Sequence, residues 1–234
     1  MAPSLLPIAH LSGGSLALIA TLMILVLAIP VVGAITARRL RMADVASSSK
    51  IARYLRTIAI LWSITALALY ALHLYGEGPS DVGVRPPHAW IEILAGFSVV
   101  AAMLVLGRGR TGAVGQQYAR RVGIVLPQTP CEWALFVVLA ATAGVCEEFL
   151  YRGYALTKIA ELSGSLALGV ILSSAAFGIA HSYQGRMGMI GTGIAGLLYA
   201  LVFVATGSLL PCMLGHFAQD IAGAVVLTRR LRHG

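Results

Sequence analysis

The sequence predicts an all-α fold, a polytopic transmembrane helical bundle of about seven spanning helices. Apolar residues make up 58% of its 234 positions, and charged residues make up only 11%. Soluble globular domains carry roughly 25% charged residues, and so few charges do not cover the surface of a water-soluble protein of this length. The charged residues also gather in short segments between long apolar runs. These observations exclude a soluble domain and a disordered chain.

Seven apolar stretches are candidates for spanning helices, because a helix needs about 20 such residues to cross a bilayer. No charged linker between them is long enough to form a second domain, so we expect one continuous membrane domain. In chain order the stretches are Gly14–Ala37, Thr57–Tyr75, Ala89–Leu106, Glu132–Leu162, Ser165–Tyr183, Met187–Thr206 and Leu209–Leu227.

The positions of Lys and Arg predict the orientation, because cytoplasmic loops of membrane proteins are enriched in both. Basic residues cluster in 38–56, in 107–131 and after Leu227, whereas 76–88 carries two acidic residues and one Arg. We therefore expect the N-terminus outside and the C-terminus in the cytoplasm. The basic residues form no face interleaved with aromatic residues, so we expect no nucleic acid as a partner. The composition, rich in Arg, Ala, Leu and Gly, favours the inner membrane of a bacterial cell.

The fourth stretch has a clear start and an unusual length. Thr129, Pro130 and Glu132 have the pattern of a capping box with proline at the first helical position, and Gly164 is suited to end the helix. At 1.5 Å per residue, the stretch is roughly 45 Å long and exceeds the hydrocarbon thickness. We expect this helix to tilt, kink or project from the membrane.

Six ionisable residues lie within the apolar stretches, where burying them is costly. A charged side chain at the centre of a spanning helix costs about 2.5–3.5 kcal/mol on insertion scales, so such groups face the bundle interior and mark a function. Two of them, Glu148 and Arg152, have the i, i+4 spacing of an ion pair, which leaves Glu147 free. The six residues are Glu147, Glu148, Arg152, His181, His216 and Asp220.

A depth count brings two of these residues together. Glu147 lies 17 residues before Gly164, and His181 lies 17 residues after it. An antiparallel hairpin that turns near Gly164 therefore places both at the same depth. His216 and Asp220 come from the last stretch, and counting from the helix ends places His216 about 10 Å from that level.

A free carboxylate beside two imidazoles is suited to hydrolysis. The carboxylate can act as a general base on water, and a histidine or a bound metal can polarise the scissile carbonyl. His181, His216 and Glu147 are also a plausible ligand set for a divalent metal, most simply zinc. The HExxH spacing of many zinc proteases is absent, so the spacing alone does not imply a metal.

These residues resemble the three motifs of the CPBP intramembrane proteases, also called the Abi or type II CAAX prenyl endopeptidase family. The motifs EExxxR, FxxxH and HxxxN or HxxxD correspond to 147–152, 177–181 and 216–220. The resemblance implies a catalytic helical core at 129–234, preceded by membrane-spanning helices at 1–128. It also implies an intramembrane endopeptidase, a metalloprotease in the family's usual description, that acts on a membrane-associated or lipid-modified peptide.

The resemblance carries roles over to these positions. It implies that Glu147 activates water, supported by the pair of Glu148 and Arg152. His181 and His216 are then metal ligands or, without a metal, groups that position water and the oxyanion. Asp220 stands where Asn is common, and because an ionised Asp donates no hydrogen bond, metal binding or orientation of a histidine is favoured.

Two other classes of function remain open at this point. Buried Glu, His and Asp residues also build proton-coupled membrane carriers, although this sequence has no internal symmetry. A non-catalytic immunity or scaffold protein on the same fold is the third possibility. The expected partners are a peptide or protein substrate and the lipid bilayer, and the sequence indicates no oligomeric state.

Overall fold

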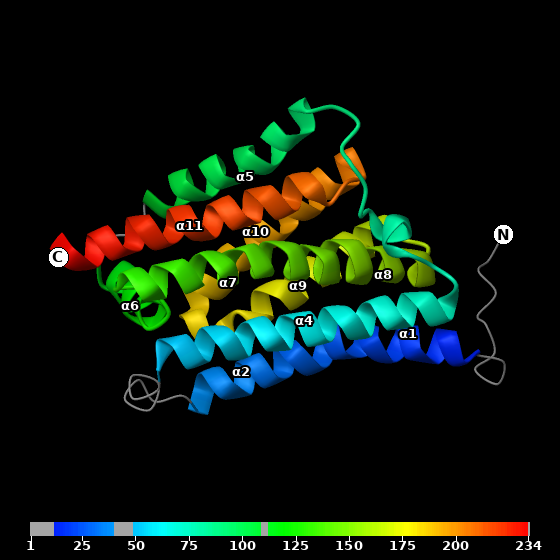
Figure 1. Ribbon diagram of the computed structural model, residues 1–234, viewed down its shortest axis with the longest axis horizontal. Helices are drawn as coiled ribbons and strands as arrows, with labels where there is room; N and C mark the ends of the chain where they lie inside the picture. Colours follow the sequence, from blue (N-terminus) through cyan, green and yellow to red (C-terminus); the bar gives the residue numbers. More distant parts are fainter. Residues whose placement is uncertain (1–11, 40–48, 109–111, 234) are drawn as a thin grey trace.

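The structure is a computed structural model that describes residues 12–39, 49–108 and 112–233 (Figure 1). These residues form helices and no strand, which confirms the predicted all-α membrane bundle. The α-helices are α1 (Gly13–Met23), α2 (Ile29–Arg39), α4 (Lys50–Tyr75), α5 (Ile91–Arg108), α6 (Gly112–Gly123), α7 (Pro130–Glu148), α8 (Thr157–Ser163), α9 (Leu166–Ala180), α10 (Gly185–Thr206) and α11 (Leu210–His233). The segments η2 (Ile24–Ala28) and η4 (Phe149–Leu156) are π-helical, and η3 (Pro79–Val82) and η5 (Ser182–Gln184) are 3-10 turns.

All seven predicted stretches coincide with apolar helices. Five helical segments among the described residues are long and apolar enough to cross a membrane, and the two others are shorter. The shorter ones are Ile91–Gly107 and Leu166–Ala180. The N-terminus-out orientation stays a prediction, as does a division of the chain at residue 128.

Helix α6 was not expected, because 107–131 was interpreted as a connecting loop. The helix lies between α5 and α7 in the chain and contacts both α10 and α11. Its Val122 is buried, and Tyr118 packs against the same apolar cluster. A single helix of 12 residues is too short to cross the bilayer, so it gave no signal in a search for spans.

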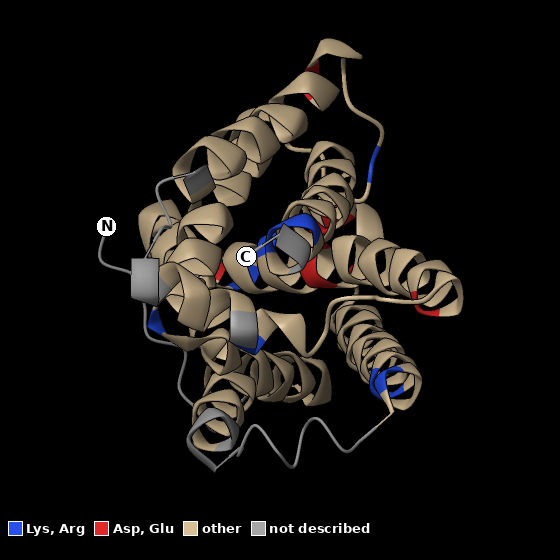
Figure 2. Cartoon of the chain, turned by 90° about the vertical axis from the view of Figure 1, so that its left-hand side faces the viewer, with Lys and Arg blue, Asp and Glu red and all other residues tan. Residues whose placement is uncertain are grey.

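The helices pack side by side along the long axis of the molecule (Figure 1). Helix α4 lies between α1 and α7, while α11 packs on both α5 and α7, and α9 packs on α10. Helix α1 begins at the end of the bundle opposite to the end where α11 finishes. Figure 2 views the α11 end and shows Lys and Arg beside the C-terminus.

The long helix is continuous from Pro130 to Ser163. It begins with the predicted capping box, in which Thr129 Oγ1 accepts a hydrogen bond from the Glu132 amide, and it ends at Gly164, whose φ is +67°. The sequence did not indicate the π-helical segment η4 within it. All eight residues of η4 are buried, and π-helical turns are frequent at functional sites.

Glycines allow α9 and α10 to approach each other closely near the end of α9. A Cβ added at Gly178 lies 2.9 Å from the Met189 carbonyl oxygen and 3.0 Å from the Gly193 Cα. Both neighbours are backbone atoms, so the contact is not relieved by a side-chain rotation. Small residues at this contact therefore let the two helix backbones pack closely.

We predict that Gly178→Ala destabilises the protein by about 1–3 kcal/mol, the usual cost of overpacking. The matched control is Gly223→Ala in α11, where an added Cβ meets nothing within 4 Å. Because alanine is the better helix former, the control is expected to be neutral or stabilising by up to about 1 kcal/mol. Thermal unfolding of both variants in detergent checks this, and equal melting temperatures would contradict the close approach of the two helices.

Candidate active site

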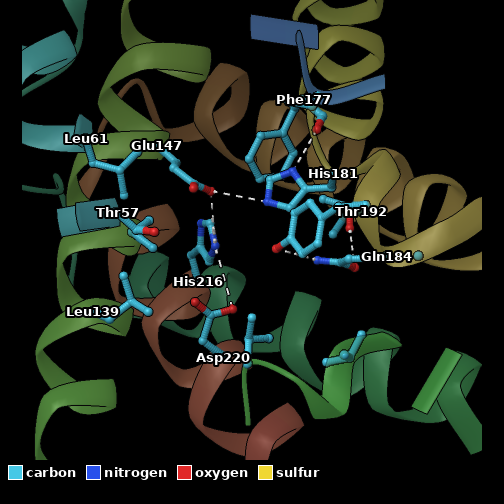
Figure 3. Close-up of a pocket in the computed structure, with 18 of the residues that line it drawn as sticks. Thr57, Leu61, Leu139, Glu147, Phe177, His181, Gln184, Thr192, His216 and Asp220 are labelled. Atoms are coloured by element: carbon cyan, nitrogen blue, oxygen red, sulfur yellow. Dashed lines mark hydrogen bonds and ion pairs between the residues drawn. The ribbon is translucent and has the colours of Figure 1, made fainter. Parts of the chain in front are cut away.

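A cavity of about 800 Å³ lies inside the bundle and is bordered by most of its helices (Figure 3). Its walls come from η2–α2, α4, α5, α6 with the segment after it, α7–η4, the end of α9 with η5, α10 and α11. Apolar side chains such as Leu61 and Leu139 form most of the lining. Four of the six predicted residues, Glu147, His181, His216 and Asp220, line it together.

Glu147 directs its carboxylate toward both histidines (Figure 3). Its Oε2 lies 3.9 Å from His181 Nε2 and 3.9 Å from His216 Nε2. The side chain is 15% exposed and therefore faces the cavity rather than bulk water. The antiparallel helices on either side of Gly164 thus bring Glu147 and His181 together, and α11 brings His216 to the same level despite the 10 Å offset from simple counting.

Glu148 points away from the cavity and binds two other predicted residues. Its Oε1 accepts a hydrogen bond of 2.9 Å from Arg152 Nη1 and lies 2.7 Å from His216 Nδ1. The Glu148 and Arg152 side chains are 0% and 1% exposed. The pair expected from the i, i+4 spacing is present, and the same carboxylate orients His216 on another helix. The sequence gave no signal for this second contact.

His181 lies at the end of α9, where it is the residue that caps the helix. Its Nδ1 lies 2.8 Å from the Phe177 carbonyl oxygen, one helical turn earlier. Because a carbonyl oxygen only accepts, this bond assigns the proton to Nδ1 and leaves the Nε2 lone pair toward Glu147. His216 Nδ1 is likewise engaged by Glu148, so its Nε2 also faces Glu147.

Asp220 lies one turn after His216 on α11. Its Oδ1 is 3.9 Å from His216 Nε2, which is too long for a hydrogen bond. Its side chain is 34% exposed, the highest value among the acidic residues of the site. The orientation of His216 therefore comes from Glu148, and Asp220 stands at the open side of the cluster.

This arrangement agrees with a comparison against protein families. Residues 129–222 match the family described as type II CAAX prenyl endopeptidase Rce1-like. This match supports the CPBP family for the C-terminal part of the chain. The match supports a CAAX-type intramembrane protease in general terms. Searches of curated proteins and of solved structures give no match.

The three motifs account for the polar cluster, but sequence reasoning missed Tyr199 and the aromatic contacts around the cluster. The Phe177 ring contacts the His181 ring at 4.7 Å between centroids, and the Arg152 guanidinium lies 4.3 Å from the Phe177 centroid. Tyr199 stacks on His216 with an interplanar angle of 14°, and its hydroxyl donates to Gln219. Phe177 belongs to the second motif, whereas a Tyr in an apolar helix carries no sequence signal of this kind.

The donor atoms of this polar cluster are chemically suited to a metal, but their arrangement does not form a complete site. The two Nε2 atoms face one carboxylate, and both histidines are bound at Nδ1, as metal-ligating histidines usually are. In the part of the chain that the structure describes, however, no group of three or more His, Cys, Asp or Glu is placed to hold an ion. Metal binding by His181, His216 and Glu147 stays a prediction.

Proposed function

We propose that this protein is an intramembrane endopeptidase that hydrolyses a peptide bond of a membrane-associated or lipid-modified peptide. One observation carries the proposal: the Glu147 carboxylate faces a cavity with two imidazole Nε2 atoms, each 3.9 Å away. The family match to CAAX prenyl endopeptidases supports the same class of reaction. The apolar lining of the cavity is suited to a substrate that partitions into the membrane.

Glu147 is the general base in this proposal. A water molecule can hydrogen-bond to the carboxylate and to an Nε2 atom at once, because groups 3.9 Å apart leave room for a bridging water. Glu147 accepts a proton as the water oxygen forms a bond to the carbonyl carbon. The same proton then passes to the amide nitrogen when the carbon–nitrogen bond breaks, so the products are a new carboxyl group and a new amine.

The histidines stabilise the oxygen that becomes negative in this step. Glu148 accepts a hydrogen bond from His216 Nδ1 at 2.7 Å, and a buried carboxylate in this position favours the imidazolium form of the ring. A protonated His216 can donate from Nε2 to the oxyanion. His181, held by the Phe177 carbonyl, positions the attacking water from the other side.

A metal-assisted reaction is the second candidate, favoured by the two Nε2 lone pairs that face Glu147. A metal held there would polarise the scissile carbonyl or the water. Metal analysis of the purified protein, before and after treatment with a chelator, separates the two candidates. Cleavage that persists without metal supports the proposal above, and cleavage restored only by added zinc supports the second candidate.

Hydrolysis in water labelled with ¹⁸O tests the proposed reaction. Purified protein in lipid vesicles is incubated with a set of apolar and lipid-modified peptides, and the products are analysed by mass spectrometry. We expect one labelled oxygen in the new C-terminal carboxylate of the upstream fragment. Intact peptides throughout the set, or fragments without the label, would contradict the proposal.

A further inference from the structure

We propose that Arg53 and Arg56 on α4 bind a carboxylate of the peptide substrate at the rim of the cavity. The inference rests on the proposed function and adds a specificity determinant to it. Neither arginine belongs to the three motifs, and both line the same cavity as Glu147. Among the described residues that line this cavity, these are the two Lys or Arg side chains.

One face of α4 connects the arginines to the site. The cavity-lining residues of α4 recur every three or four positions, which is the spacing of one helix face. Figure 3 shows that two of them, Thr57 and Leu61, lie beside Glu147. This face comprises Arg53, Tyr54, Arg56, Thr57, Ile60, Leu61 and Ile64.

The distance along this face sets the number of peptide residues between a carboxylate bound at the arginines and the bond presented to Glu147. Leu61 follows Arg56 by five residues and Arg53 by eight, which is about 7.5–12 Å of helix. An extended peptide rises about 3.3 Å per residue. A substrate carboxylate at the arginines therefore lies roughly two to four residues from the bond presented to Glu147.

The rim is fixed by contacts between α4 and the segment that follows α6. Arg53 Nη2 donates to the Ile124 carbonyl at 2.9 Å, and the Tyr54 hydroxyl donates to the Val125 carbonyl at 2.6 Å. Arg56 is exposed, and no hydrogen bond or ion pair engages it within the described part of the chain. A guanidinium group in this position is available for the two parallel hydrogen bonds that it makes with a carboxylate.

Charge within the cavity favours this assignment over contact with lipid headgroups alone. Glu147 and Asp220 place negative charge on the α7 and α11 sides, and the arginines place positive charge on the α4 side. An anionic group of a bound peptide is therefore attracted to α4 and repelled from the acidic residues. Other basic residues at this end differ: Lys50 is paired with Glu132, and Arg229 and Arg230 do not line the cavity.

The test compares three versions of one cleaved peptide: a free C-terminal carboxylate, a C-terminal amide, and an amide that ends in Glu. The proteins are the wild type, Arg56→Gln and the control Arg230→Gln, which removes one exposed positive charge from the same end of the bundle. Hydrogen bonds between an arginine and a carboxylate are among the stronger ones in proteins. We expect the wild type and the control to prefer the free acid over the plain amide by about 10-fold or more in kcat/KM.

In Arg56→Gln this preference should fall toward unity, and Arg56→Lys should keep part of it. Recovery of the rate with the amide that ends in Glu would identify a side-chain carboxylate as an accepted source and would support the proposal. Equal cleavage of all three peptides by the wild type would overturn it and leave the proposed function intact. An equal loss on all three peptides in Arg56→Gln would also overturn it, because a headgroup or structural role predicts that result. Failure of the wild type to cleave any peptide would overturn both.

Discussion

Glu147→Gln is expected to abolish peptide hydrolysis while the protein keeps its fold. The amide has nearly the shape of the carboxylate but does not accept a proton from water, and general base catalysis contributes about 10²–10⁴-fold. Within the described part of the chain Glu147 makes only its 3.9 Å contacts with the two histidines, which are too long for hydrogen bonds, so the substitution breaks no structural bond there. The measurement is kcat for peptide cleavage in vesicles, together with the melting temperature.

Glu161→Gln is the matched control for this experiment. Glu161 is 49% exposed on α8, and its partner Lys158 is also bound by Glu77, so its loss leaves no isolated charge. The control should cleave at the wild-type rate. If Glu147→Gln abolished a proton-coupled flux and no cleavage were ever observed, a carrier would be the better description. A fully active Glu147→Gln protein would instead favour a scaffold or immunity role.

Arg152→Met is expected to destabilise the protein by about 3–5 kcal/mol, because it removes the permanent cation from the buried Glu148 carboxylate and leaves only the His216 contact. Glu148 is fully buried, and its Oε2 has no hydrogen-bond partner among the described residues. Methionine fills much of the arginine volume, so the change is mainly electrostatic. Denaturant unfolding of the purified protein in detergent measures the loss.

The double variant Glu148→Gln with Arg152→Met separates charge from packing. Removing both charges should restore much of the stability, because the desolvation cost of both groups disappears. Hydrolysis should nevertheless stay impaired, since a glutamine beside His216 Nδ1 no longer stabilises an imidazolium. A double variant as unstable as Arg152→Met would show that the guanidinium acts through its contacts with Phe177 and not through Glu148.

Much of the fold could be predicted because the bilayer imposes simple rules on a sequence. Apolar length locates the helices, and the capping box at Thr129 and the glycine at 164 mark the ends of the longest one. The same rules failed for α6, which is short and amphipathic and therefore resembles a loop in a search for spans. The π-helical turns of η4 also escaped, since they depend on packing around eight buried residues and not on a local motif.

The site was predictable only where the cost of burying charge made a residue conspicuous. Glu147, His181 and His216 stood out for this reason, and the structure brings them together. The contacts of His216 were harder to predict. Counting along straight helices placed it about 10 Å from the level of Glu147. Its bond to Glu148 joins residues 68 positions apart. Tyr199, which stacks on His216, carries no charge and was not singled out.

The ion pairs of Lys158 bear on the side of the membrane from which peptides reach the cavity. Lys158 binds Glu161 on its own helix and Glu77 in the connection between α4 and α5, and no residue of that connection borders the cavity. The hollow instead extends toward α6 and the first turns of α4. Peptides are therefore expected to enter, and fragments to leave, from one side of the bilayer. In sealed liposomes, protein molecules inserted in opposite orientations would then cleave substrate supplied on opposite sides of the membrane.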